Sequence, residues 1–353
     1  MTVKAILSDL HCHKWSRFST LDSKGVSSRL TIILNEMKRA AKELIDAGGK
    51  DMVLAGDLFH VRGSIEPSVF NPTHECVEEI LGMGIDIWAI PGNHDLEGKD
   101  TSSIGNAMQT FGAMDGFTVI TEPSLVKEID AVMVPWVASI DDLKSCLDSL
   151  KIDHYDDRDI LDVIIHAGID GVLPGLPDHG LDGEDLANLG FRRVFAGHYH
   201  NHKEVYPGVV SIGATTQQTF SDIGAKAGFL LVDDNDYKYR ASHAPQFVEL
   251  NEDTDPNDIP LIADGNYVRV SGMELDDKEI NQIRDNLNDL GAKGTSFMVA
   301  RKTEATRTNS TQAKGMTLAQ SVSAFVENLK SPFEKEVQSR CSAILTRVEA
   351  VSE

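Results

Sequence analysis

DMVLAGDLFH, residues 51–60, joins an apolar run to a polar turn and sets the pattern for the first half of the chain. Its run DMVLA (51–55) predicts a buried strand, because short apolar runs bounded by turn residues are typical of strands in α/β cores. Asp57 follows Gly56 where this strand ends. His60, three residues later, is either a second functional group or an ordinary polar residue on a loop.

Strands and helices alternate around this stretch. VKAIL (3–7) and IDIWAI (85–90) predict two more strands, and apolar residues at helical spacing predict helices over about 30–45 and 73–82. This order implies parallel strands in a layered α/β core.

Further short strands are expected between residues 117 and 233, closely spaced and with few helices between them. They are FTVIT (117–121), AVMVPWV (131–137), DVIIH (162–166), RRVFAG (192–197), VVSIGA (209–214) and GFLLVD (228–233). Two facing sheets flanked by helices accommodate them better than one open sheet. We therefore expect an α/β sandwich domain over residues 1–250.

The pattern changes near residue 250, where ELNEDTDPNDIP (249–260) is typical of a linker. YVRVSG (267–272), a helix, and SFMVARK (296–302) then predict a small β-α-β subdomain over 251–305. Residues 306–353 are expected to form a polar linker and amphipathic C-terminal helices.

Size, cysteine content and charge limit the classes of protein. The chain has 353 residues, of which 41% are hydrophobic, so it can bury a sizeable core. No apolar run reaches the roughly 20 residues of a membrane helix, and the N-terminal one is too short for a signal peptide. The 4 cysteines lack paired spacing, which favours a cytoplasmic location, in a bacterial cell or a phage-infected host.

The net charge is strongly negative: 33 Lys and Arg against 55 Asp and Glu, or −22. Such a chain repels phosphate backbones at long range. A nucleic-acid substrate would therefore require bound cations, a local basic patch or a basic partner.

Polar residues follow five of the predicted strands. They are Asp9, His11, Asp57, Asn93, His94, Asp95, His166, His198 and His200. Because the carboxyl ends of strands in α/β layers meet at one edge, these side chains should gather there. Carboxylate, amide and imidazole together suit manganese, iron or zinc, and their number indicates two ions. Asp57 is the natural bridge, since a carboxylate has two oxygens.

In this order the motifs DxH, GD, GNHD, a single His and GHxH resemble those of the calcineurin-like metallophosphoesterases, over roughly residues 1–235. The resemblance implies that one ion is held by Asp9, His11, Asp57 and His200, and the other by Asp57, Asn93, His166 and His198. It also implies that His94 is the acid or transition-state donor, and we expect Asp95 to orient its ring. The remaining histidines, namely His13, His74, His154, His179, His202 and His243, are expected at the surface.

GDLFH as a unit is similar to the Mre11/SbcD-type DNA nuclease branch, where a second His helps to position the DNA strand. The segment 206–233 and the β-α-β unit are loosely similar to that branch and to its DNA-capping domain. This implies an exonuclease, and also an endonuclease, that acts in DNA end processing with Mn²⁺ or, alternatively, Mg²⁺. The branch further implies DNA, a Rad50/SbcC-type ATPase and a second copy of the chain as partners.

A basic patch supports this interpretation. Residues 291–316 contain five basic residues and one acid, a local charge of 5 − 1 = +4. We expect DNA contacts from Lys293, Arg301, Lys302 and Arg307. Arg17 and Arg62 are either further contacts or solvated loop residues.

Two other functions stay open. One is a stand-alone metallophosphatase or cyclic-nucleotide phosphodiesterase, which would need no residues beyond 250. The other is a metal-free interaction module, which would require eroded ligands, and none of the expected ligands is missing.

Overall fold

The computed structural model describes residues 3–98, 105–154, 156–301, 317–328 and 330–349. Residues 1–300 and 301–353 form two units, each described by itself.

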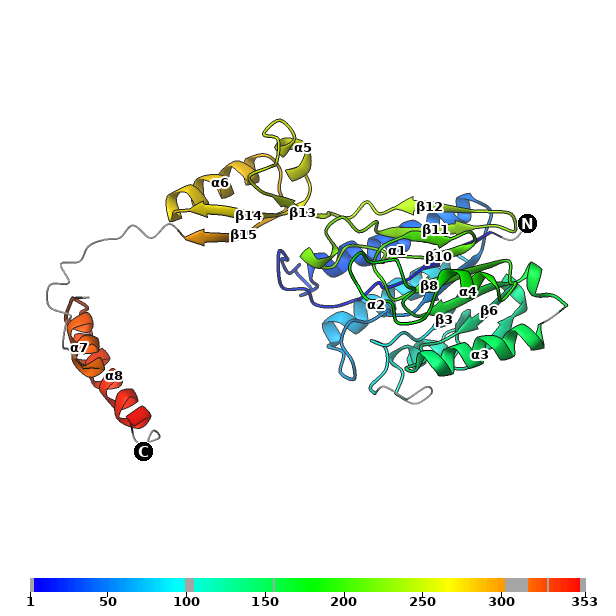
Figure 1. Ribbon diagram of the computed structural model, residues 1–353, viewed down its shortest axis with the longest axis horizontal. Helices are drawn as coiled ribbons and strands as arrows, with labels where there is room; N and C mark the ends of the chain where they lie inside the picture. The colour runs from blue at the N-terminus through cyan, green and yellow to red at the C-terminus, as the bar shows by residue number, and fades with distance from the viewer. Residues whose placement is uncertain (1–2, 99–104, 155, 302–316, 329, 350–353) are drawn as a thin grey trace. The chain divides into compact units, whose positions relative to one another are not determined.

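Two six-stranded sheets form the core of the first unit (Figure 1). The first has, in spatial order, β12 (Tyr237–Ala241), β11 (Gly228–Val232), β1 (Lys4–Leu7), β2 (Asp51–Ala55), β3 (Asp86–Ile90) and β4 (Phe117–Val119). The second has β5 (Ser124–Val126), β6 (Ala131–Val134), β7 (Asp162–His166), β8 (Arg193–Gly197), β10 (Val209–Ser211) and β9 (Lys203–Tyr206). The strands β1 to β4 are parallel, as are β6, β7, β8 and β10.

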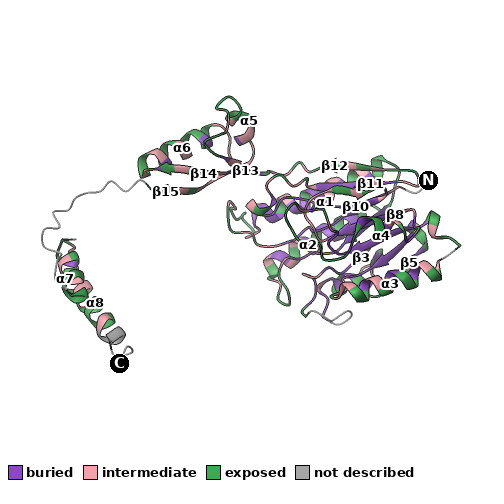
Figure 2. Cartoon of the chain, in the orientation of Figure 1, coloured by how far each residue is buried: buried purple, intermediate pink, exposed green. Residues whose placement is uncertain are grey.

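Helices cover the outer face of each sheet. On the first sheet, α1 (Ser28–Asp46) and α2 (Pro67–Gly82) pack against alternate residues of β1, β2 and β3. On the second, α3 (Ile140–Asp153) and α4 (Gly183–Ala187) pack against β6, β7 and β8. The other strand residues, such as Val53 and Ile164, fill the space between the sheets and are fully buried (Figure 2). The expected α/β sandwich is confirmed.

Few α-helices separate the strands between residues 117 and 233, as expected, and the longer of the two, α3, separates β6 from β7. Its signals are present in the sequence: the side chain of Ser139 caps the first turn, and Leu143, Leu147 and Leu150 are buried at helical spacing. Short turns of 3₁₀ helix connect other elements: η1 (Ala107–Ala113), η2 (Lys127–Ile129), η3 (Arg158–Ile160) and η4 (Phe220–Asp222).

A separate three-stranded sheet follows, made of β13 (Phe247–Leu250), β14 (Tyr267–Leu275) and β15 (Gly294–Arg301). It packs against α5 (Ile259–Ala263) and α6 (Asp277–Asp289) around a small core of its own. Residue 250, where we expected the boundary, is the last residue of β13, which pairs with β14 of the expected subdomain.

The second unit contains α7 (Leu318–Asn328) and α8 (Glu334–Glu349), which contact each other. Within the described ranges, no helix is both long and apolar enough to cross a membrane.

Candidate metal centre

The ends of five parallel strands, β1, β2, β3, β7 and β8, supply the polar side chains that the motifs predicted. The turns after β1 and β2 are joined by backbone hydrogen bonds from Asp9 and His11 to Gly56 and Asp57. The pairing β7–β8 places His166 beside Gly197. Parallel pairing aligns these strand ends within each sheet, and the packing of the two sheets brings together residues more than 180 positions apart, such as His11 and His200.

A first group forms around His11. Its Nε2 lies 3.1 Å from Nε2 of His200, 3.9 Å from Oδ1 of Asp9 and 3.7 Å from Oδ2 of Asp57. Asp9, His11 and His200 present their ligand atoms within 4.8 Å of one another. This is the first of the two ligand sets that the motifs imply.

A second group forms around His166. Its Nε2 lies 3.4 Å from Oδ2 of Asp57 and 3.2 Å from Oδ1 of Asn93. The same Asn93 oxygen lies 3.0 Å from Nδ1 of His198. This is the second implied set, and Asp57 joins it to the first.

Asp57 joins the two groups through one oxygen rather than two. Its Oδ2 faces both His11 and His166, whereas Oδ1 accepts a hydrogen bond of 2.8 Å from the backbone N–H of His94. The expectation that Asp57 bridges two ions stays a prediction, since a carboxylate oxygen that accepts one hydrogen bond keeps a second lone pair.

The residues fit a divalent metal pair. Asp9 carries the clearest sign: its Oδ2 accepts from Ser8 Oγ and from the His198 N–H, but its buried Oδ1 has no hydrogen-bond partner. A buried carboxylate oxygen left in this state is costly without a cation or a donor. The set of carboxylate, amide and imidazole groups matches borderline ions such as manganese, iron or zinc.

The backbone at the site is strained to bring these groups together. Asp9, His11, Asp57 and His198 have positive φ angles of 51°, 48°, 54° and 101°. Such conformations cost roughly 1–3 kcal/mol each for residues other than glycine and tend to occur at functional sites. At Gly92, an added Cβ would collide with the carboxylate and the backbone N of Asp57.

Burial and neighbouring charges set the protonation states of these groups. Burial lowers the pKa of His11 to about 4, so its imidazole is neutral. Burial alone would raise the pKa of Asp57, but His166 and His11 hold it well below its ordinary range. Burial likewise opposes protonation of His166, but Asp57 raises its pKa to about 9. A cation that binds His166 must displace this proton.

His94 and His60 lie beside the first group. The His94 Nδ1 donates to the His60 carbonyl at 2.6 Å, and the two rings stack with centroids 5.3 Å apart. Nδ1 of His60 lies 3.3 Å from Nδ1 of His11. His60 is therefore part of the site, rather than an isolated polar residue on a loop.

Two neighbours of His60 were not anticipated as site residues. Trp15 donates from Nε1 to the His11 carbonyl at 3.2 Å, and its ring lies 4.6 Å from that of His60. His13, expected at the surface, is half-buried with its ring 5.1 Å from that of His60. No pattern in the sequence signals Trp15, because its role arises from the fold of the loop after β1.

Asp95 has a different role from the one expected. Its carboxylate accepts hydrogen bonds from the backbone N–H groups of Asp57, Phe59 and Gly92, at 2.8, 3.0 and 2.9 Å. Burial and the charge of Asp57 raise its pKa to about 7, against the effect of these donors. Asp95 thus holds the turns after β2 and β3, while the His60 carbonyl orients the His94 ring.

Another carboxylate that was not assigned a role contacts a metal-ligand candidate. Asp222, at the end of η4, lies 2.9 Å from Nδ1 of His200. The pattern Thr219-x-x-Asp222 is the signature of a capping box and could have indicated a buried acid at this position.

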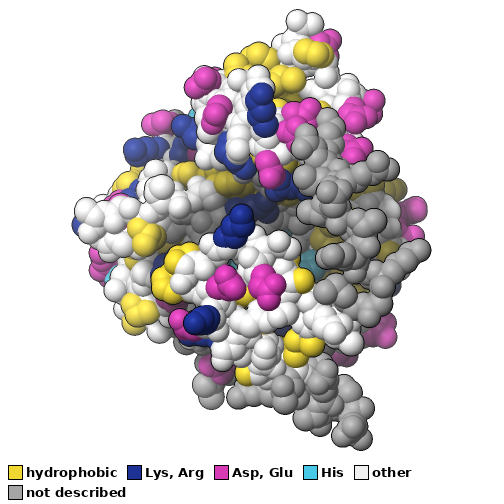
Figure 3. Space-filling model, turned by 90° about the vertical axis from the view of Figure 1, so that its left-hand side faces the viewer, with side chains coloured by type: hydrophobic (Ala, Val, Ile, Leu, Met, Phe, Trp, Pro, Cys, Tyr) yellow, Lys and Arg dark blue, Asp and Glu magenta, His cyan; other side chains and the backbone are white. Residues whose placement is uncertain are grey.

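The expected DNA contacts are only partly described. Lys293 and Arg301 are exposed, whereas Lys302 and Arg307 lie outside the described residues. Figure 3 shows Lys and Arg side chains on the same face as exposed His atoms. Arg17, exposed on the loop after β1, contacts Ser296 of β15 and the Phe220 ring.

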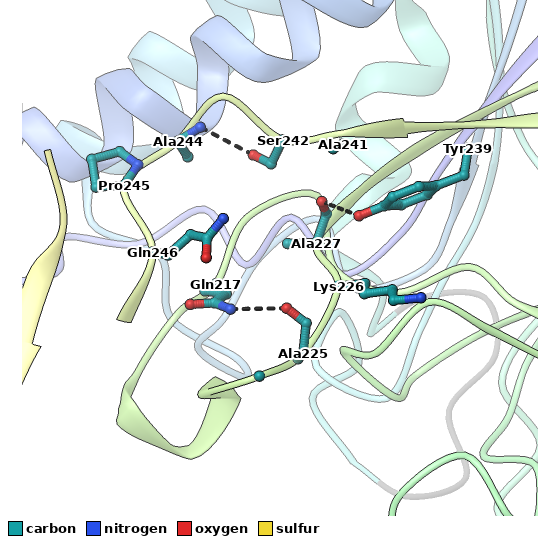
Figure 4. Close-up of a pocket in the computed structure, with 11 residues that line it drawn as sticks. Gln217, Ala225, Lys226, Ala227, Tyr239, Ala241, Ser242, Ala244, Pro245 and Gln246 are labelled. Carbon is teal, nitrogen blue, oxygen red and sulfur yellow. Dashed lines mark hydrogen bonds between the residues drawn. The ribbon is translucent and has the colours of Figure 1, made fainter. Parts of the chain in front are cut away.

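A cavity of about 340 Å³ lies away from the metal-ligand candidates, next to the segment that leads to β13 (Figure 4). The side chain of Gln217 donates to the Ala225 carbonyl and accepts from the N–H of Phe247, and the Tyr239 hydroxyl donates to the Ala227 carbonyl. These polar groups are satisfied within the chain, so the cavity offers no ligating group comparable to the cluster at the strand ends.

Comparison with known proteins agrees with this site. The model of the calcineurin-like phosphoesterase family matches residues 4–202, which include all of the metal-ligand candidates. The chain is 23% identical over 213 residues to "Exonuclease subunit 1" of Enterobacteria phage T4, a match that covers 57% of this chain and 58% of that protein.

Two solved structures are more distant. A dimetal phosphatase from Danio rerio has 10% identity and a TM-score of 0.43, and the match covers 68% of this chain and 96% of that one. A nuclease from Pseudomonas putida has 13% identity and a TM-score of 0.27, with 59% and 66% covered. At these TM-scores neither likeness supports an argument about function.

Proposed function

The chain belongs to the calcineurin-like phosphoesterase family, and from this premise we propose that it is a two-metal-dependent DNA nuclease. It would hydrolyse phosphodiester bonds at DNA ends, as an exonuclease and also as an endonuclease. The observation that carries the proposal is the shared Asp57 oxygen between two ligand groups, with His94 beside them. Similarity to the phage exonuclease subunit supports DNA as the substrate.

Each side chain has a defined part in this reaction. Bound divalent ions, Mn²⁺ or Mg²⁺, would neutralise phosphoryl oxygens and lower the pKa of a water. Those ions would be held by seven residues: Asp9, His11, Asp57, Asn93, His166, His198 and His200. His94 donates from Nδ1 to the His60 carbonyl, so it is the imidazolium form, with a second proton on Nε2, that would hydrogen-bond the phosphoryl oxygen or protonate the leaving oxygen.

His60 is assigned to positioning the DNA strand. Its ring is half-buried, stacks on His94 and contacts Trp15 and His13. Burial and the neighbouring His94 lower the pKa of His60 to about 4, so the ring is neutral at pH 7. A neutral, partly exposed ring beside His94 suits contact with a nucleotide better than ion pairing with phosphate.

The test compares cleavage of end-labelled duplex DNA with turnover of a small phosphodiester, both with Mn²⁺. His94→Ala should slow both reactions by about 10²–10⁴-fold, as expected for loss of an acid. His60→Ala should bind Mn²⁺ but should lose much more activity on duplex ends than on the small substrate. His243→Ala, an exposed histidine outside the site, is the matched control and should behave as the wild type.

Brisk turnover of the small phosphodiester without Mn²⁺-dependent DNA cleavage would overturn the nuclease assignment. That result would favour the stand-alone phosphatase or cyclic-nucleotide phosphodiesterase. Equal activity of wild type and His60→Ala on duplex ends would remove only the role given to His60.

Partners are part of the same proposal. Phe325 of α7 and Phe333, just before α8, are exposed at 64% and 67% of their surface, and these apolar side chains suit docking to an ATPase of the Rad50/SbcC type. A second copy of the chain would bind through α1 and α2. Sedimentation of the purified chain alone tests its self-association. Co-sedimentation with such an ATPase tests docking of the ATPase.

A further inference from the structure

Asp222 lies behind one of the metal-ligand candidates. Its Oδ1 is 2.9 Å from Nδ1 of His200, and the Asp222 residue is 8% exposed. On the other side of the ring, Nε2 of His200 lies 3.1 Å from Nε2 of His11, inside the first ligand group. The ring of His200 thus connects a buried carboxylate to the site.

This contact determines which nitrogen carries the proton. An ionised carboxylate only accepts hydrogen bonds, so Nδ1 of His200 must be the donor, and in the neutral ring Nε2 keeps its lone pair. The other candidate-ligand imidazoles have uncharged partners at Nδ1. His166 donates to the Ala55 carbonyl at 2.7 Å, His11 faces Nδ1 of His60, and His198 lies 3.0 Å from Oδ1 of Asn93. Among the candidate ligand histidines in the described part of the chain, His200 alone has a carboxylate as the partner of its Nδ1, the ring nitrogen that points away from the ligand group.

The carboxylate itself is fixed by the turn that carries it. Oδ2 of Asp222 accepts from the backbone N–H groups of Gln218 and Thr219, at 2.7 and 2.8 Å. The Thr219 side chain in turn accepts from the N–H of Ser221. Oδ1 is therefore held toward His200 and has little freedom to turn away.

The same turn is anchored in the three-stranded sheet through Phe220. Its ring centroid lies 4.9 Å from that of Phe247 in β13 and 6.0 Å from that of Phe18. The guanidinium carbons of Arg17 and Arg269 lie 4.9 and 5.1 Å from its centre. A shift of β13 or β14 would therefore move η4 and the carboxylate behind His200.

We propose that Asp222 is a positioning residue, which holds His200 in the tautomer that ligates through Nε2, and that Phe220 makes this dependent on the three-stranded sheet. This inference rests on the proposed assignment of His200 as a ligand. Carboxylate–histidine–metal arrangements typically change metal affinity 10–100-fold when the carboxylate is lost. The alternative is that Asp222 only stabilises the turn, by accepting the N–H groups of Gln218 and Thr219.

The test measures Mn²⁺ binding by titration calorimetry on protein first freed of metal with a chelator. In Asp222→Asn, the amide oxygen can still accept from Gln218 and Thr219, so its NH₂ group faces His200 and favours the wrong tautomer. We expect Mn²⁺ affinity at one of two sites to fall about 10–100-fold. Glu279→Gln is the control, because Glu279 has the same position in the capping box of α6 that Asp222 has in the capping box of η4; its Mn²⁺ affinity should equal that of the wild type.

A second measurement does not depend on a variant. Long-range ¹H–¹⁵N spectra of the metal-free wild type should show the His200 ring protonated at Nδ1. Protonation at Nε2 alone would overturn the proposal, as would Asp222→Asn binding Mn²⁺ as tightly as the wild type. Failure of the wild type itself to bind Mn²⁺ would instead overturn the metal assignment on which the inference rests.

The link to the sheet is tested with Phe220→Ala, which should weaken Mn²⁺ binding several-fold. Phe191→Ala is the control, because it removes a buried ring from the core between the second sheet and its helices. It should leave Mn²⁺ binding unchanged. Equal effects of these two substitutions would overturn the link between the sheet and the metal ligand.

Discussion

Residue 92 is a glycine, and its lack of a side chain leaves room for the carboxylate of Asp57. An added Cβ at Gly92 would overlap the carboxylate and the backbone N of Asp57. We expect Gly92→Ala to lower stability by about 1–3 kcal/mol, as for other overpacked interiors, and to weaken Mn²⁺ binding. Urea unfolding and titration calorimetry measure the two effects. Gly82→Ala, where a Cβ meets nothing within 4 Å, is the control; a Gly92→Ala protein that matched it would contradict the packing argument.

Between elements, a buried ion cluster joins the two sheets at the start of β7. The carboxylate of Asp162 contacts Lys4 of β1 at 2.7 Å, and it accepts from Nε of both Arg192 and Arg193 at 2.9 Å. Burial would raise the pKa of Asp162, but Lys4 and the two arginines outweigh it and hold the pKa below its ordinary value. A carboxyl group with a lowered folded pKa stabilises the fold above its unfolded pKa, and this contribution is lost as the pH falls below about 4.

This cluster predicts a pH profile. At pH 7, Asp162→Asn should lose roughly 3–5 kcal/mol, because three buried or half-buried cations lose their counter-charge. Below about pH 4 the difference from the wild type should shrink, since Asp162 is protonated first in the unfolded chain and, at still lower pH, in the folded protein. Urea unfolding at pH 7, 5 and 3.5 measures this. Parallel profiles for the two proteins would mean that Asp162 does not link the sheets electrostatically.

At the scale of the whole molecule, the metal-ligand candidates and the cores of both large sheets lie within residues 1–300. A chain ending at Lys302 should therefore bind Mn²⁺ with the affinity of the full chain and turn over a small phosphodiester at the same rate. Calorimetry and a colorimetric assay measure these. Loss of Mn²⁺ binding on truncation would show that the second unit contributes to the site.

Much of this protein follows from its sequence. Apolar runs that end in Asp, Asn or His predict strands with polar residues at one edge, because parallel strands align their carboxyl ends. That rule gathers Asp9, His11, Asp57 and Asn93 at one edge of the first sheet, whereas His166 reaches them only through the packing of the second sheet. Helix α3 could also have been predicted, since Ser139 and the leucine spacing are ordinary helix signals.

Other features depended on contacts between distant residues, which local pattern does not encode. The expected linker over 249–260 includes the last two residues of β13. They form a strand because they pair with β14, a contact that the local sequence does not indicate. Asp95 follows His94 in sequence, yet it binds the amides of Asp57, Phe59 and Gly92 instead of the His94 ring.

By itself the sequence determined the layered α/β fold and the set of metal-ligand candidates, because both depend on periodicity and on residue type at strand ends. Only the tertiary structure decided how those groups are held. It gave one oxygen of Asp57 to both ligand groups, placed His60 against His94, and set Asp222 behind His200. These are matters of distance and direction between segments far apart in the chain, and they exist only once the two sheets have packed.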